Sequence, residues 1–175
     1  AIQYLAERVK QGLQVTTVAT SAETEKIALQ CGIPVVPLDA VEYIDIDIDG
    51  ADEVDADMNL VKGGGGALLR EKIVAAASRA FIVIAGDSKR VEVLGKFPLP
   101  AEVIPFGWKH TARQLAALGC STSLREKDAK IFITDNGNYI IDCHFGAIAE
   151  PAVLEQQINN IPGVVDNGLF VKMAT

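Results

Sequence analysis

The chain has 175 residues, enough for one substantial hydrophobic core or two modest ones. Its 16 Lys and Arg residues against 23 Asp and Glu residues give a net charge of −7, which makes nucleic acids and anionic membranes poor partners. Three cysteines without paired spacing indicate reduced thiols and a cytoplasmic location, and no run is apolar enough to span a membrane. A basic pocket within such an acidic protein can still bind a small phosphorylated molecule.

The first half of the chain alternates predicted helices and strands. Apolar residues at helical spacing predict a helix at the start of the chain, with a core stripe formed by Ile2, Leu5, Ala6 and Val9. A strand over 15–18, a helix over 22–31 and a strand near Val35 follow. This alternation is typical of a parallel sheet covered by helices.

Residues 44–49 alternate isoleucine and aspartate without exception, which is typical of a strand with two unlike faces. We expect the isoleucines to pack inward, and Asp45 and Asp47 to lie on a solvated or helix-flanked face. Gly50 and Ala51 end the strand, so Asp49 and Asp52 are predicted at its C-terminal tip. Ligands of open α/β sheets bind in the crevice beyond these tips.

A lysine and four glycines, Lys62 to Gly66, precede a run of strong helix formers that begins at Ala67. Backbone N–H groups in such a loop can approach an anion closely, and the helix dipole favours negative charge there. The loop matches neither a P-loop nor G-x-G-x-x-G. Glu71 is predicted to face the loop, off a core stripe of Leu69, Ile73 and Ala76 or Ala77. An isolated Glu here would be an ordinary first-turn acid, but the nearby carboxylates and Lys62 favour a catalytic one.

A strand over 81–85 and the Pro98-Leu99-Pro100 break complete the first half. The second half then shows the pattern of a split βαβ unit. Its predicted elements are a strand near 103, a helix over 108–118, a strand over 121–125, a hairpin of 131–134 and 139–143 turning on Asn136-Gly137, a helix over 151–160 and a strand near 164. We therefore predict an α/β fold: a Rossmann-like parallel-sheet domain over 1–98, a smaller ferredoxin-like α+β domain over 99–170, and a return toward the first domain over 171–175.

Several motifs together resemble the signature of the A-type ribose-5-phosphate isomerases. They are Asp49-Gly50-Ala51-Asp52-Glu53, Lys62-Gly63-Gly64-Gly65, Leu69-Arg70-Glu71-Lys72, Asp87-Ser88-Lys89, Leu94-Gly95-Lys96-Phe97-Pro98-Leu99-Pro100, Thr134-Asp135-Asn136-Gly137-Asn138 and Ile161-Pro162-Gly163-Val164-Val165. The resemblance implies interconversion of ribose 5-phosphate and ribulose 5-phosphate in the pentose phosphate pathway, without a metal or organic cofactor. It also implies a homodimer or a higher homo-oligomer.

The resemblance further implies a role for each site residue. Glu71 matches the base that moves a proton between C2 and C1 of the sugar through an enediolate. Asp49, Asp52 and Lys62 match residues that bind the sugar and assist ring opening, and Lys62 also stabilises charge on the carbonyl oxygen. The remaining substrate-binding positions are Gly50, Ala51, Gly63, Gly64, Gly65 and Lys89.

The ends of the chain depart from this family pattern. The family opens with a strand and a Gly-Thr-Gly-Ser-Thr phosphate loop, whereas this chain opens within a helix, and residues 169–175 resemble a strand that enters a return segment. We therefore expect a chain trimmed at both termini that binds substrate weakly on its own. Two alternatives remain: a non-catalytic sugar-phosphate sensor, which needs no base, and a CoA-transferase-like enzyme, in which a glutamate is the nucleophile.

Overall fold

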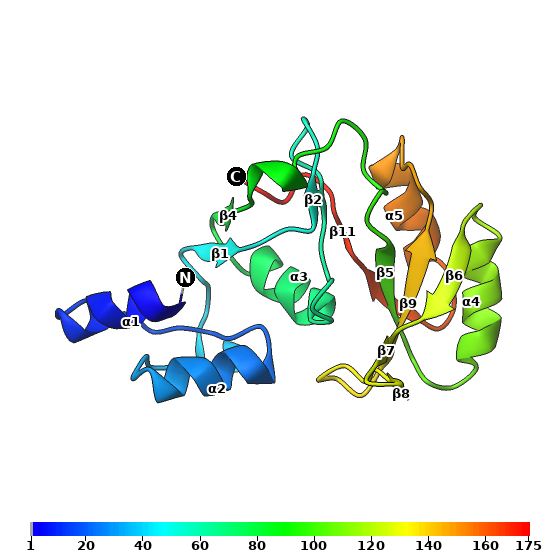
Figure 1. Cartoon of the computed structure of the whole chain (residues 1–175). Helices are drawn as coiled ribbons and strands as arrows, with labels where there is room; N and C mark the ends of the chain where they lie inside the picture. The colour runs from blue at the N-terminus through cyan, green and yellow to red at the C-terminus, as the bar shows by residue number, and fades with distance from the viewer. Residues whose placement is uncertain (1) are drawn as a thin grey trace.

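The computed structural model describes residues 2–175, in which five helices and eleven strands alternate along the chain (Figure 1). The helices are α1 (Ile2–Lys10), α2 (Ala22–Gln30), α3 (Leu68–Ala76), α4 (Trp108–Ala116) and α5 (Pro151–Asn159). The strands are β1 (Asp47–Asp49), β2 (Glu53–Val54), β3 (Leu60–Val61), β4 (Phe81–Val83), β5 (Leu99–Val103), β6 (Ser121–Leu124), β7 (Glu126–Lys127), β8 (Lys130–Ile131), β9 (Tyr139–His144), β10 (Val164–Asn167) and β11 (Leu169–Phe170).

The second half forms a four-stranded antiparallel sheet in the order β10-β5-β9-β6. Since these strands and helices follow the chain order β5-α4-β6-β9-α5-β10, the unit is the predicted split βαβ arrangement. Its core is formed by side chains of the strands and of α4 and α5, among them Val103, Leu115, Ile141 and Ile158, which are fully buried. Helix α3 packs against β10 and β5, which brings the first half against this sheet.

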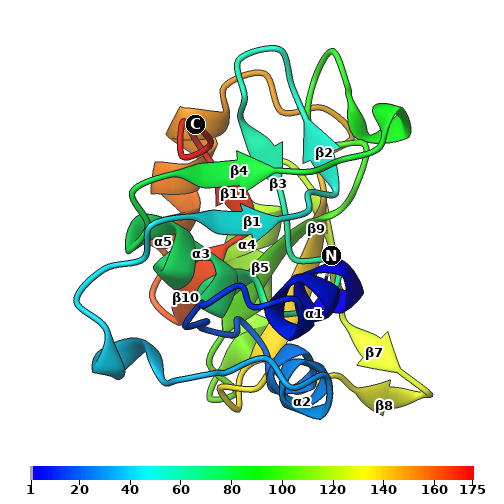
Figure 2. The ribbon, with the colours of Figure 1, turned by 90° about the vertical axis from the view of Figure 1, so that its left-hand side faces the viewer.

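The first half contains a parallel pair, β1 with β4, with Asp47 opposite Phe81 and Ile48 opposite Ile82 (Figure 2). A three-stranded antiparallel sheet, β11-β3-β2, lies beside it, so the last strand of the chain returns to the first half. Helices α1 and α2 lie apart at one side, joined through a small core of their own. This core includes the predicted stripe of α1, formed by Ile2, Leu5, Ala6 and Val9.

The predicted orientation of the isoleucine–aspartate strand is wrong. Ile46 and Ile48 are 53% and 55% exposed, whereas Asp47 is only 8% exposed. The neighbouring strand gives the reason: Phe81, opposite Asp47, is buried, while Ile82, opposite Ile48, is on the exposed face. The polar face of β1 therefore points into the protein, and β1 itself is shorter than the predicted strand.

The stripe predicted for the helix after the glycine loop is also shifted. Helix α3 buries Leu68, Val74 and Ala75, whereas Ile73 is 47% exposed. Leu68, at the first helical position, packs against Gly63 of the loop, so the buried face of α3 includes Leu68 and lies on a different side of the helix from the predicted one. Glu71 is nevertheless on the side of the helix that faces Lys62.

The predicted strands at 15–18 and near Val35, and the predicted hairpin of 131–134 with 139–143, are wrong. Residues 15–18 and 35 form a single parallel bridge, between Thr17 and Val35, instead of two strands. Residues 131–134 do not form a hairpin with β9, which pairs with β5 and β6, although Gly137 does form the predicted turn. The hairpin in this region is β7–β8, turning on Asp128 and Ala129. Among residues 2–175, none of the helices is long and apolar enough to cross a bilayer.

Candidate active site

The ammonium group of Lys62 lies at the centre of a cluster of carboxylates. Lys62 follows β3, and its backbone N–H donates to the Gly168 carbonyl at 2.9 Å, which sets where the side chain begins. Its Nζ lies 2.9 Å from Asp49 Oδ2, 2.5 Å from the Gly50 carbonyl oxygen and 3.3 Å from Glu71 Oε2. The side chain is 3% exposed. The end of β1 and the first turn of α3 therefore meet at the ammonium group of Lys62, the residue that precedes the four glycines.

Two aromatic rings form an apolar floor under this cation. The Lys62 Nζ lies 5.5 Å from the centroid of Phe170 and 6.0 Å from that of Phe81. Both rings are buried and contact each other at 6.1 Å between centroids. Ring faces attract a cation, and an apolar surround strengthens each charge interaction in the cluster. The rings therefore hold the ammonium in place and exclude water from one side.

Glu71 is suited to accept a proton. It lies in the first turn of α3, and its Oε2 atom is buried and forms an ion pair with Lys62 without hydrogen-bond geometry. Burial raises the pKa of this carboxyl above that of an ordinary glutamate; the Lys62 charge lowers it, and the Asp49 charge raises it further. A carboxylate with a raised pKa that is still ionised near neutrality is a stronger base than an exposed one.

The glycine loop is joined to the cluster through Asp52. Asp52 Oδ2 accepts the backbone N–H of Gly64 at 2.7 Å. The sequence predicts that the N–H groups of residues 63–65 face a ligand. The Gly64 N–H does not, because it donates to Asp52. The N–H groups of Gly63 and Gly65 have no hydrogen-bond partner among residues 2–175, and since Gly63 is buried and Gly65 is exposed, the Gly65 N–H is the one open to an incoming oxygen.

Asp47 is a member of the cluster that sequence reasoning dismissed. Its side chain is buried, and its Oδ2 atom has no hydrogen-bond partner within residues 2–175. Burial, with a contribution from Asp49, raises the pKa of Asp47 to about 6, although Lys62 acts in the opposite direction. The strict alternation of residues 44–49 puts Asp47 and Asp49 on the same face of the strand. This pattern is the sequence signal that could have identified Asp47 as a member of the cluster.

Asp47→Asn is expected to stabilise the protein by about 1–3 kcal/mol at pH 7.5 and to have little effect near pH 4. Because the pKa in the folded protein, about 6, lies above the ordinary 3.8, folding favours the protonated acid. The free-energy cost of ionising the buried Asp47 is thus absent below about pH 4. It increases as the pH rises to the pKa of the folded protein and has its full value at pH 7.5. Urea unfolding of both proteins at the two pH values measures the difference.

Asp45→Asn is the matched control, since Asp45 is two residues away on the same run but is 79% exposed. Its free energy of unfolding should change by less than about 0.5 kcal/mol at either pH. A loss of stability in Asp47→Asn at pH 7.5 would show that the ionised Asp47 supports the fold instead of opposing it.

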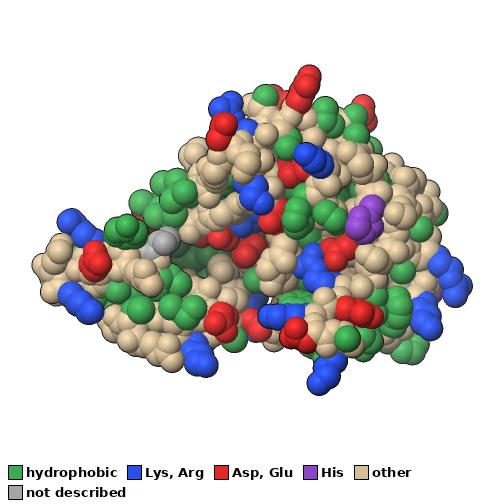
Figure 3. Space-filling model, in the orientation of Figure 1, with side chains coloured by type: hydrophobic (Ala, Val, Ile, Leu, Met, Phe, Trp, Pro, Cys, Tyr) green, Lys and Arg blue, Asp and Glu red, His purple; other side chains and the backbone are tan. Residues whose placement is uncertain are grey.

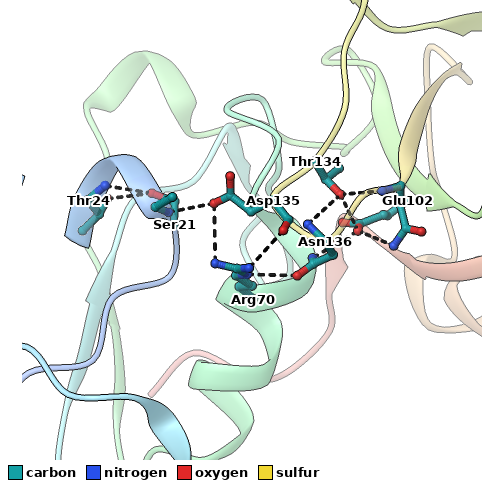
Figure 4. Close-up of polar contacts among 9 residues, drawn as sticks. Ser21, Thr24, Arg70, Glu102, Thr134, Asp135 and Asn136 are labelled. Atoms are coloured by element: carbon teal, nitrogen blue, oxygen red, sulfur yellow. Dashed lines mark hydrogen bonds and ion pairs between the residues drawn. The ribbon is translucent and has the colours of Figure 1, made fainter. Parts of the chain in front are cut away.

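A second polar network holds α3 against the other half of the chain (Figure 4). Arg70, the neighbour of Glu71, donates to Asn136 Oδ1 at 2.9 Å and to the carbonyl oxygen of Asp135 at 3.1 Å. The turn that carries these acceptors is anchored by the fully buried Glu102. Its Oε1 accepts the Thr134 hydroxyl at 2.9 Å and the Asn136 amide at 3.2 Å. Sequence reasoning did not single out Glu102.

The same turn reaches the first helices, because Asp135 Oδ2 accepts the backbone N–H of Ala22 at 2.7 Å (Figure 4).

Lys89, in the short 3₁₀ helix Asp87–Lys89, forms no ion pair with the cluster within residues 2–175. Acidic side chains gather in the hollowed centre of the face shown in Figure 3. Within residues 2–175 there is no group of three or more His, Cys, Asp or Glu side chains arranged to hold a metal ion.

The comparisons with known proteins point to one family. A sequence profile described as ribose 5-phosphate isomerase A (phosphoriboisomerase A) matches residues 16–175. Ribose-5-phosphate isomerase A of Bacillus mycoides is 52% identical over 173 residues, which cover 98% of this chain and 78% of that protein.

Solved structures are similar to the same extent. A D-ribose-5-phosphate isomerase in complex with phospho-erythronic acid matches with a TM-score of 0.95 and 42% identity, over 99% of this chain and 78% of that one. Ribose 5-phosphate isomerase A from Methanocaldococcus jannaschii matches with a TM-score of 0.93 and 44% identity, over 98% and 77%. The chain belongs to the ribose 5-phosphate isomerase A family.

Proposed function

We infer that this protein is an aldose–ketose isomerase that interconverts D-ribose 5-phosphate and D-ribulose 5-phosphate, a step of the pentose phosphate pathway. The observation that carries this inference is the buried Glu71 carboxylate, 3.3 Å from Lys62, in a chain that belongs to this isomerase family. A base beside a cation is what the reaction needs, since a proton moves between adjacent carbons while negative charge develops on an oxygen.

Glu71 is the proposed base. In the open-chain aldose it takes the proton from C2; the electron pair of that bond forms the C1–C2 double bond of an enediolate, and the π electrons of the C1 carbonyl move to O1. The proton on Glu71 exchanges with solvent, and Glu71 then donates a proton to C1 while the O2 hydroxyl proton moves to O1, which gives the ketose. The raised pKa of Glu71 makes its carboxylate a stronger base than that of an ordinary glutamate, which favours removal of the C2 proton.

Lys62 and the two aspartates complete the proposed chemistry. The Lys62 ammonium stabilises the charge that develops on the carbonyl oxygen. Asp49 and Asp52 accept hydrogen bonds from sugar hydroxyls and assist ring opening, with the backbone of Gly50 and Ala51 between them. Asp52 is linked to the glycine loop at 2.7 Å, so a sugar hydroxyl at Asp52 also lies beside Gly63, Gly64 and Gly65.

The phosphate group needs a different part of the site. The cluster places one lysine among Asp47, Asp49, Asp52 and Glu71, and this excess of carboxylates suits hydroxyl groups and repels a phosphate dianion. Lys89 is the proposed cation for the phosphate, since within residues 2–175 it forms no ion pair with the carboxylates of the cluster.

The test is to incubate ribose 5-phosphate with the protein in D2O and to follow products by NMR, with and without EDTA. We expect ribulose 5-phosphate that carries deuterium at C1, at the same rate in both samples, since the proposed proton transfer uses no metal. Absence of ribulose 5-phosphate would refute the isomerase. Product without deuterium would support a hydride shift, and inhibition by EDTA would support a metal mechanism.

The two alternatives have no observation in their favour. A sugar-phosphate sensor has no use for a buried carboxylate with a raised pKa, and the CoA-transferase mechanism uses the glutamate as a nucleophile toward a much larger substrate. Binding of ribose 5-phosphate without turnover would favour the sensor.

We also propose a cytoplasmic homodimer. The cysteines Cys31, Cys120 and Cys143 are free, as in proteins of reducing compartments. Large apolar side chains such as Phe106, 90% exposed, and Ile133, 60% exposed, are of the kind that a second subunit covers. Sedimentation equilibrium gives the mass, and a monomer at micromolar concentration would contradict the dimer.

A further inference from the structure

We propose that Arg125, between β6 and β7, is a positioning residue of the isomerase: it holds the Gly63–Gly64 peptide and, through that peptide, the carboxylate of Asp52. This inference rests on the proposed function. Arg125 is 62 positions from Gly63 and 61 from Gly64 in the chain, so its role follows only from the folded structure.

Arg125 uses its whole guanidinium group in two sets of contacts. Its Nη1 donates to the carbonyl oxygen of Gly63 at 2.6 Å and to that of Gly64 at 3.3 Å. Its Nε donates to Asp142 Oδ2 at 2.9 Å, and its Nη2 donates to Asp142 Oδ1. The side chains of Arg125 and Asp142 are 14% and 16% exposed. A bidentate pair of this kind fixes the plane of the guanidinium, so Asp142 aims Arg125 at the loop.

The bonds on Gly63 and Gly64 belong to one peptide unit. The carbonyl of Gly63 and the N–H of Gly64 lie in the same plane and point in opposite directions, because the peptide is trans. Arg125 holds the carbonyl end at 2.6 Å, and Asp52 Oδ2 accepts the N–H end at 2.7 Å. The peptide dipole therefore lies between a cation at its negative end and a carboxylate at its positive end. Rotation of this peptide would break both hydrogen bonds.

The glycine loop can accommodate a rotated Gly63–Gly64 peptide without steric clash from side chains of its own. Gly63 has φ +104°, a region that only glycine adopts readily, and consecutive glycines have many other conformations of similar energy. The loop has one hydrogen bond of its own at this peptide, from the Gly66 N–H to the Gly63 carbonyl oxygen at 3.0 Å, and contacts from outside the loop add to it. Arg125 supplies one of these at the peptide that contacts Asp52.

A second contact from the same segment supports this interpretation. The ring of Phe132 packs on Gly66, where an added Cβ would lie 2.4 Å from ring atoms. The backbone N–H of Phe132 donates to the carbonyl oxygen of Arg125 at 2.9 Å, so both residues belong to one unit that closes the β7–β8 hairpin. The hairpin therefore contacts the loop at two points, on Gly63–Gly64 and on Gly66.

The test compares Arg125→Met, Arg125→Lys and the control Arg79→Met in steady-state turnover of ribose 5-phosphate. Arg79 also pairs with an aspartate, at 3.7 Å, but its side chain is 63% exposed and lies outside the proposed site. Arg125→Met should lower kcat by about 10²-fold with KM within about threefold, since a misplaced group costs about this much. Arg125→Lys should recover part of kcat, because Lys can donate to the Gly63 carbonyl but cannot form the bidentate pair. Arg79→Met should match the wild type.

The Gly64 amide provides a readout that a purely structural role would not change. In the wild type its ¹H resonance should lie downfield and exchange slowly with D2O, because it donates to a carboxylate. In Arg125→Met the Gly64 amide should lose both properties, while the amides of α3 keep their shifts and exchange rates. If Arg125→Met does not fold, Arg125→Lys carries the test with a loss of about tenfold in kcat.

Unchanged kcat in a folded Arg125→Met protein overturns the proposal, as does lost kcat with an unchanged Gly64 amide. If the wild type itself shows no turnover, the isomerase assignment fails, whereas the Gly64 amide still reports whether Arg125 holds the loop. The two failures are therefore distinguishable.

Discussion

Glu71→Gln is expected to lower kcat for ribose 5-phosphate by about 10²–10⁴-fold and to change KM by only a few-fold. Glutamine has the shape of glutamate and keeps an oxygen beside Lys62, but it cannot take a proton from carbon. Substrate contacts of the remaining residues are unchanged, so the loss is confined to the chemical step. Initial rates over a range of substrate concentrations separate kcat from KM.

The pH dependence adds an independent measurement of the same role. Because Glu71 acts as a base, kcat/KM of the wild type should fall as pH decreases through the pKa of the free enzyme. Burial raises the pKa of Glu71, so this fall should be centred above about 4.3, the value of an ordinary glutamate. Glu25→Gln, on the exposed surface of α2, is the control and should match the wild type. Substantial turnover by Glu71→Gln would remove Glu71 as the base.

The parts of this site that sequence reasoning predicted lie close together in the chain. Asp49, Lys62 and Glu71 span 23 positions, and each is placed by a local signal: the end of a strand, a glycine loop and the start of a helix. Such signals depend on backbone preferences and spacing, which act over a few residues. The helix and strand positions of the second half were predictable for the same reason.

What sequence reasoning missed depends on contacts between distant residues. The alternation of residues 44–49 shows that a strand has two faces, but only the packing of Phe81 decides that the aspartate face is buried. Arg125 reaches the loop through a hairpin that turns on Asp128 and Ala129, at φ 54° and 58°. Ala rarely adopts this conformation, so the sequence contains no turn signal there.

Lys62→Met is expected to lower kcat by about 10²–10³-fold. It should also shift the decrease of kcat/KM on the acid side of the pH profile to higher pH. The first effect is typical of the loss of one group that stabilises a developing oxyanion. The second follows from the charge of Lys62, which lowers the pKa of Glu71; without this charge the carboxyl is protonated at a higher pH. Rates measured from pH 5 to pH 9 give both quantities.

The same substitution should lower the free energy of unfolding by about 3–5 kcal/mol at pH 7.5, as expected when one partner of a buried ion pair is removed. Asp49 and Glu71 then lose their shared cation, and Asp47 has no positive charge nearby to offset its burial. Part of the stability should return near pH 5, because Asp47, whose pKa is raised to about 6, is then protonated and no longer repels its neighbours. Lys26→Met, at an exposed position of α2, should unfold like the wild type. If Lys62→Met retains wild-type stability at pH 7.5, the carboxylates do not depend on this cation, and its role is restricted to the reaction.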